Sequence, residues 1–93
     1  MKATIWNNGS LGWGIRVGNK NREKYFSKNQ DIIIINFDGI NYGFELKPSF
    51  WRKCCEIRGK AIKNWVEKHG LKSKDKINLD VIKSYKIFKA SLI

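Results

Sequence analysis

The chain has 93 residues, and its 19 Lys and Arg against eight Asp and Glu give a formal net charge of +11. A chain of this length buries one core, so we expect a single domain over residues 1–93. No apolar run approaches the ~18 residues of a membrane span and no secretory signal is visible, so we expect a cytoplasmic protein.

The first third of the chain predicts two strands joined by a polar loop. Residues 3–6 are typical of a strand, and Asn7-Asn8-Gly9-Ser10 is a cluster of turn-forming residues. A second strand is expected at 15–17. Residues 21–26 then fit one or two helical turns that begin at an Asn cap.

The clearest local pattern is a hairpin between residues 31 and 46. The β-branched run Ile32 to Ile35 is typical of a buried strand. Asp38-Gly39 then suits the two positive-φ positions of a tight turn. Apolar residues alternate with polar residues and glycine after the turn, which predicts a strand with one face toward the core: Ile40, Tyr42, Phe44 and Leu46.

The rest of the chain predicts a loop, a helix and two further strands. Pro48 ends the hairpin strand because it cannot donate to the ladder, and a mixed loop is expected over 49–58. A helix follows that ends at Gly70, and strands are expected at 77–81 and 85–93 around a turn at Lys83-Ser84. One face of the helix is formed by Ile62, Trp65, Val66 and His69. The sum is a mainly β fold with short helices, closed or nearly closed so that few sheet edges are exposed.

Asp38, Glu45 and Lys47 have the spacing of a metal-dependent nuclease site, in which carboxylates share Mg²⁺ and a Lys polarises water. If Asp38-Gly39 is the hairpin turn, Glu45 lies roughly 20 Å away at ~3.3 Å per residue, too far for one metal. The single histidine, His69, sits at a helix end, which favours packing or a dipole interaction over a base. We therefore expect no catalytic residue, no cofactor and no metal.

Cys54 and Cys55 are neighbours in the sequence. A bond between adjacent cysteines is strained, and a zinc site would need more ligands than His69 alone could add. We expect both thiols to be reduced.

The positive charge extends from Arg16 to Lys89 within the expected fold, which favours a polyanionic partner, nucleic acid before an anionic membrane. The alternative is that the charge serves only solubility. Two loops, Asn7 to Trp13 and Lys47 to Arg58, combine aromatic residues with donors. Asn and Arg make paired hydrogen bonds to base edges, while Lys and Ser suit phosphates. The aromatic residues of these loops could instead pack against the barrel.

Three consecutive parts of the chain resemble the B3 DNA-binding domain: GIRVGNKNREKYF, the Ile-rich hairpin, and YGFELKPSFWRKCCEIRGKAIKNWVEKHGL. The similarity is strongest to the bacterial version, the recognition or effector domain of EcoRII-like type II restriction endonucleases. It covers residues 6–71. Trp51 corresponds to the tryptophan of a loop in the B3 domain, and Trp65 and Val66 correspond to residues of the helix that follows this loop. The resemblance implies a B3-like pseudobarrel with about seven strands and two short helices, whose two arms enter the DNA major groove.

The resemblance also implies where DNA would be contacted. The N-arm is 7–13 with Arg16 at its base, and the C-arm is 47–56 followed by Arg58. Arg22 and Lys24 would lie near backbone phosphates, whereas Lys72 and Lys74 are expected away from both arms. The expected DNA-contacting residues are Asn7, Asn8, Ser10, Trp13, Arg16, Lys20, Arg22, Lys24, Lys47, Ser49, Trp51, Arg52, Lys53 and Arg58.

The expected partner is therefore double-stranded DNA of the nucleoid, which the protein would bind with a sequence preference. A separate nuclease or regulatory protein is a possible further partner. Three alternatives stay open on the residues alone. An OB-like barrel would bind RNA or single strands by stacking bases on Trp13, Phe50 or Trp51. A small metal-dependent nuclease would cut DNA, and a protein-partner module would show no salt-sensitive affinity for nucleic acid.

Overall fold

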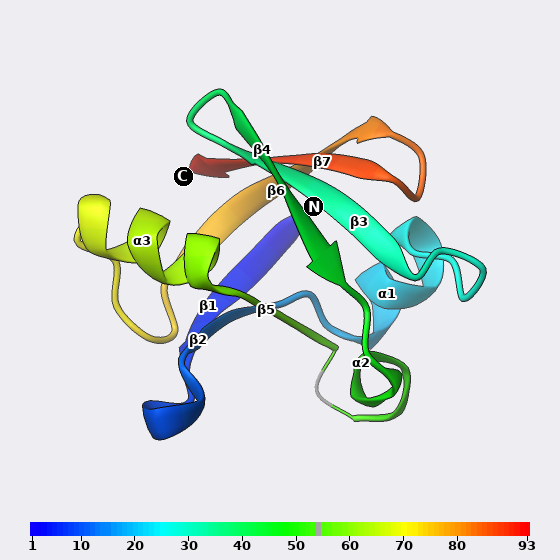
Figure 1. The fold of residues 1–93 in the computed structure, drawn as a ribbon, viewed down its shortest axis with the longest axis horizontal. Helices are drawn as coiled ribbons and strands as arrows, with labels where there is room; N and C mark the ends of the chain where they lie inside the picture. The colour runs from blue at the N-terminus through cyan, green and yellow to red at the C-terminus, as the bar shows by residue number, and fades with distance from the viewer. Residues whose placement is uncertain (54) are drawn as a thin grey trace.

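The computed structural model describes residues 1–53 and 55–93. These residues form seven strands, three α-helices and one short 3-10 helix, so the predicted mainly β fold is confirmed (Figure 1). The elements in chain order are β1 (Lys2–Asn7), η1 (Gly9–Leu11), β2 (Trp13–Arg16), α1 (Asn19–Tyr25), β3 (Ile32–Phe37), β4 (Ile40–Glu45), α2 (Pro48–Arg52), β5 (Glu56–Arg58), α3 (Lys60–Lys68), β6 (Lys76–Lys83) and β7 (Ile87–Leu92).

The seven strands form one strongly curved sheet in the order β4-β3-β7-β6-β1-β2-β5. All neighbours are antiparallel except β3 and β7, which are parallel. The two end strands approach each other where the ring of Phe44 in β4 covers Gly59, the residue after β5. A Cβ at Gly59 would come within 2.6 Å of that ring, so the glycine is what lets the ends close in. The result is a nearly closed, barrel-like arrangement.

The core is built from alternate residues of the strands and one face of α3. Ile62, Trp65 and Val66 of α3 are buried, as the helical period predicts. An aromatic cluster packs α1 and α2 against the sheet. The ring of Phe26, next to α1, stacks on the ring of Phe88 of β7 with 4.8 Å between ring centres, and it contacts the ring of Phe50 of α2 edge-on with 5.1 Å between centres. Burial of apolar surface, to which these rings contribute, is the main stabilising contribution in a domain of this size.

The β3–β4 hairpin has the predicted turn, with Asp38 at φ 53° and Gly39 at φ 90°. The predicted inward face is only half correct, because Phe44 is buried but Ile40 is 58% exposed and Tyr42 is 37% exposed. Both lie in register with buried residues of β3. They stay exposed because β4 is the last strand of the sheet, and both line an open hollow that faces α3.

Two local predictions were wrong. The expected loop over 49–58 instead contains helix α2 and strand β5, which pairs with β2. Helix α2 forms because a proline in the first turn is pre-set for a helix and because Phe50 anchors it in the core. The expected Asn cap of α1 is instead Gly18 at φ 82°, without a side-chain cap. The amide of Asn21 donates to the carbonyl oxygen of Val17 at 2.9 Å. With α2 included, the helices number one more than the predicted two.

Three further observations complete the description. The turn between β6 and β7 is present, but it spans residues 84–86 rather than the predicted Lys83-Ser84, because β6 extends to Lys83. Cys55 is a buried free thiol, while the prediction for Cys54 falls outside the described residues. None of the helices in the described part of the chain is long and apolar enough to cross a membrane.

Candidate nucleic-acid interface

The side chain of Glu56 joins the two predicted arms. Its Oε2 accepts a hydrogen bond from Nδ2 of Asn8 at 2.6 Å, and its Oε1 accepts one from Nε of Arg16 at 2.8 Å. Arg58 also donates through Nε to the same carboxylate. The Glu56 side chain is only 3% exposed. One carboxylate therefore connects the tip of the N-arm, its base and the strand that follows the C-arm.

Gly14 provides the room for this carboxylate. The register of β2 and β5 pairs Gly14 with Arg58 and Arg16 with Glu56, so the Glu56 side chain reaches across β2. A Cβ at Gly14 would lie 2.6 Å from the carboxyl carbon and Oε2 of Glu56. A residue with a side chain at position 14 would push Glu56 away from its three donors.

The cluster keeps Glu56 ionised. Burial raises the pKa of Glu56, but the hydrogen bonds from Arg58, Arg16 and Asn8 together outweigh it, so the pKa lies below its ordinary value. One negative charge is thus shared by two guanidinium groups. The cluster keeps a net positive charge while both arginines are held in place.

Arg16 is restrained on two sides. Its guanidinium carbon lies 4.0 Å from the centre of the Trp6 ring, and its Nε is bound to Glu56. Among the described residues, no hydrogen bond involves the terminal nitrogens of Arg16 or Arg58. Both arginines therefore present a pre-oriented pair of donors outside the cluster.

The C-arm consists of α2 and the residues around it. Figure 1 shows η1 and α2 projecting at the same end of the barrel, with β5 between them. Beside β5 lies a cavity of about 230 Å³. Its walls carry predicted DNA-contacting residues together with two carboxylates: Lys47, Ser49, Lys53, Arg58, Glu45 and Glu56. The structure thus brings Lys47 and Lys53 next to the cluster around Glu56, whereas Arg52 lines a separate hollow with Trp51 and Lys28.

The aromatic residues of the arms pack largely against the protein. Phe50 is 1% exposed, and Trp51 meets it edge-on at 5.1 Å. Trp13 is partly buried against the core. The exposed polar residues of the arms are Asn7, Ser10, Lys47, Ser49, Arg52 and Lys53.

Three residues predicted to contact DNA belong to α1, and the structure gives one of them an internal role. Nη1 of Arg22 donates to the carbonyl oxygen of Trp51 at 3.0 Å and lies 3.3 Å from Sγ of Cys55. Its side chain is 14% exposed. Lys24 lines a hollow with Tyr85 of the β6–β7 turn, away from both arms. Lys20 is exposed.

The acidic residues of the rejected nuclease site lie at opposite ends of β4, as the hairpin predicts. Asp38 accepts hydrogen bonds from Nζ of Lys68 at 2.9 Å and contacts Nε2 of His69 at 2.9 Å. These contacts hold the pKa of Asp38 at about 2. Glu45 pairs with Ile32 at the far end of the hairpin. No group of three or more His, Cys, Asp or Glu suited to a metal occurs in the part of the chain that the structure describes.

Sequence reasoning missed Glu56, Gly14 and Trp6, and it misplaced Lys74. Lys74 was expected away from both arms, but it lines a groove with Trp6 and Arg16 at the base of the N-arm. The reason is that the link after α3 pairs with β1, where the amide of Lys74 donates to the carbonyl oxygen of Ile5 at 2.7 Å. No local signal reveals such contacts, since Arg16 and Glu56 are 40 residues apart.

Comparisons with protein-family models, with curated proteins and with solved structures give no match for this chain. The resemblance to the B3 domain therefore stays a prediction.

Proposed function

We propose that this protein binds double-stranded DNA with a sequence preference, through the η1 and α2 arms, in the way expected of a B3-like recognition domain that does not itself cut DNA. The observation that carries the proposal is the cluster around Glu56. It holds Arg16 and Arg58 through their Nε atoms and leaves their terminal nitrogens available. A pre-oriented guanidinium is the group best suited to paired hydrogen bonds with a guanine edge.

The charge of the chain supports the same function. A net charge of +11 on 93 residues creates a field that attracts polyanions and speeds their association. Phosphate contacts by Lys and Arg supply affinity and orientation, whereas contacts to base edges supply preference. The exposed lysines around the arms suit the first task, and the restrained arginines suit the second.

Packing of the loop aromatics favours duplex over single-stranded ligands. Single-strand binders stack bases on exposed aromatic faces. Phe50 is buried, and Trp51 and Trp13 are partly buried against the core, so the protein itself already covers part of each ring. The arms instead carry donors that suit groove edges and phosphates.

The deciding experiment is competition between duplex and single-stranded DNA at low salt, followed by selection of bound duplexes from a random pool. We expect duplex to compete more strongly and the selected pool to converge on a preferred site. With about five to eight phosphate contacts, the affinity should fall with salt at a log–log slope near −5 to −7. Failure to bind duplex at low salt, or a pool that never converges, would contradict the proposal.

A further inference from the structure

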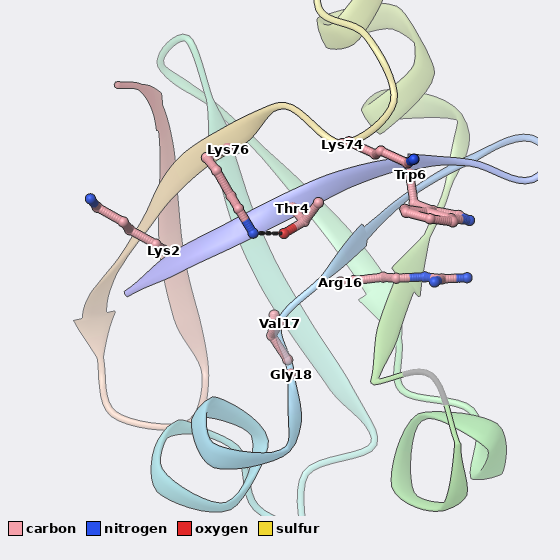
Figure 2. A pocket seen from close by; sticks show the side chains of 8 residues that line it. All are labelled: Lys2, Thr4, Trp6, Arg16, Val17, Gly18, Lys74 and Lys76. Atoms are coloured by element: carbon pink, nitrogen blue, oxygen red, sulfur yellow. Dashed lines mark hydrogen bonds between the residues drawn. The ribbon is translucent and has the colours of Figure 1, made fainter.

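A basic groove runs along the outer face of the sheet, beginning at the base of the N-arm. Its volume is about 620 Å³, and Figure 2 shows its walls, which come from β1, β2, the two residues before α1, the link after α3 and the start of β6. Four of its lining residues are cations, and no acidic side chain of the described residues lines it: Lys2, Arg16, Lys74 and Lys76. The groove is therefore complementary in charge to a polyanion.

The strand register arranges these groups in an ordered way. Thr4 of β1 pairs with Arg16 of β2 on one side and with Lys76 of β6 on the other, so the three form one row across the sheet. Lys76 donates through Nζ to Oγ1 of Thr4 at 2.7 Å (Figure 2). Lys2 and Trp6 lie two residues to either side of Thr4 on the same face, because side chains alternate along a strand.

Arg16 connects this groove to the arms. Its guanidinium lies against the Trp6 ring in the groove, while its Nε is bound to Glu56 in the cluster between the arms. A ligand that reaches Arg16 from the arms is thus at the mouth of the groove. Because Arg16 covers one face of Trp6, that face cannot stack a base, and the groove is better suited to a backbone of phosphates than to single-stranded bases.

Lys74 lies at the end of the groove nearest the N-arm. It has φ 80°, in the left-handed region that favours glycine, yet the position holds a lysine. Figure 2 shows its side chain beside Trp6 at the arm end of the groove. Because glycine is the less strained residue at such a φ, replacing Lys74 by glycine removes its charge without adding backbone strain.

We propose that this groove binds the phosphodiester backbone of duplex DNA that flanks the site read by the arms, an inference that rests on the proposed function. From Trp6 to Lys2 the groove follows β1 for four residues, about 13 Å at ~3.3 Å per residue. At 3.4 Å per base pair, that length corresponds to about four base pairs beyond the arms. The groove adds affinity without adding sequence preference.

The first test compares two variants that remove three charges each. The groove variant carries Gln in place of Lys2, Lys74 and Lys76. The control variant carries Gln in place of Lys63, Lys83 and Lys86. The control residues are exposed: Lys63 lies on α3, Lys83 at the end of β6 and Lys86 in the β6–β7 turn. Each phosphate contact contributes about 0.9 to the log–log salt slope, so the groove variant should lose about 2.7 and the control less than one. The proposal of DNA binding in the groove is overturned if the salt slope falls equally in both variants or does not fall in the groove variant.

The second test separates charge from folding. Lys74→Gly removes one charge and relieves the backbone, so the slope should fall by about one while the unfolding midpoint stays the same or rises. Tyr85→Gly, at φ 65° in the β6–β7 turn, is the matched control that relieves strain without changing charge. It should leave the slope unchanged. If the salt slope is also unchanged in Lys74→Gly, DNA binding in the groove is contradicted.

The third test uses duplex length. Affinity of the wild-type protein should rise as about four base pairs are added beside the selected site, and this gain should be absent in the groove variant. If the gain is identical in both proteins, the groove proposal fails while binding by the arms stands. If the wild-type protein binds no duplex of any length at low salt, the proposed function itself fails.

Discussion

Nη1 of Arg22 in α1 lies 3.0 Å from the carbonyl oxygen of Trp51 in α2, so α1 holds α2 in place. The same nitrogen reaches the carbonyl oxygen of Phe50 at 3.4 Å. This contact assigns Arg22 to the support of the C-arm. The resemblance implies that Arg22 lies near DNA phosphates, but its contacts inside the protein give it a structural role.

Arg22→Ala should therefore lower the free energy of unfolding, by about 1.5–3 kcal/mol, because it removes charge-assisted hydrogen bonds at a mostly buried side chain. The control is Lys20→Ala on the same helix, an exposed residue whose loss should change stability by less than ~0.5 kcal/mol. Denaturant unfolding measures both. At temperatures where the Arg22→Ala variant is folded, its DNA affinity should depend on salt concentration with the same log–log slope as that of the wild type. A slope reduced by about 0.9 would instead indicate a phosphate contact.

Gly14→Ala should destabilise the protein by about 1–3 kcal/mol, since the new Cβ would meet Glu56 at 2.6 Å. The cost depends on the Glu56 side chain, so the double variant with Glu56→Ala should show strong non-additivity. A double-mutant cycle followed by denaturant unfolding provides the measurement. Additive effects of the two changes would mean that Gly14 is needed for another reason.

Glu56→Gln should change the two kinds of DNA binding in opposite directions. Loss of the negative charge raises the net positive charge, so binding to scrambled duplex should tighten slightly. Loss of the charged acceptor loosens Arg16 and Arg58, so discrimination of the selected site should fall by about 1–3 kcal/mol. Titrations with selected and scrambled duplexes measure both quantities. A parallel change on the two duplexes would show that Glu56 does not orient the arginines.

Stability should decline in acid as Asp38 and Glu56 are protonated. The pKa of Asp38 is lowered from 3.8 to about 2 by Lys68 and His69, and the pKa of Glu56 is lowered from 4.5 because the hydrogen bonds outweigh burial. Lowered values in the folded state mean that the stabilisation is complete above the unfolded-state pKa values and is lost as pH falls through the folded-state values. Unfolding followed between pH 6 and pH 2 should therefore show a progressive loss below pH 4.5.

Asp38→Asn provides the control for that pH dependence. It removes one of the two groups, so the decline between pH 3.8 and about 2 should become shallower than in the wild type. An acid profile identical to the wild type would show that the contacts of Asp38 with Lys68 and His69 do not contribute to stability in solution.

Several elements of this protein follow from neighbouring residues alone. The Asp38-Gly39 turn is determined by the ability of those two residues to adopt positive φ. The buried face of α3 follows from the spacing of Ile62, Trp65 and Val66. Net charge is a sum over the chain and needs no structure. Such features depend on contacts within about four residues, and the sequence by itself is sufficient to predict them.

Other features depend on which strands become neighbours, and only the tertiary structure decides those. The cluster around Glu56 requires β2 beside β5, and the basic groove requires residues 74–76 beside β1. Ile40 and Tyr42 alternate like core residues but stay exposed because β4 is an edge strand. In each case a residue's role is set by contacts with partners far along the chain, and a shift of one residue in strand register would direct its side chain to the opposite face.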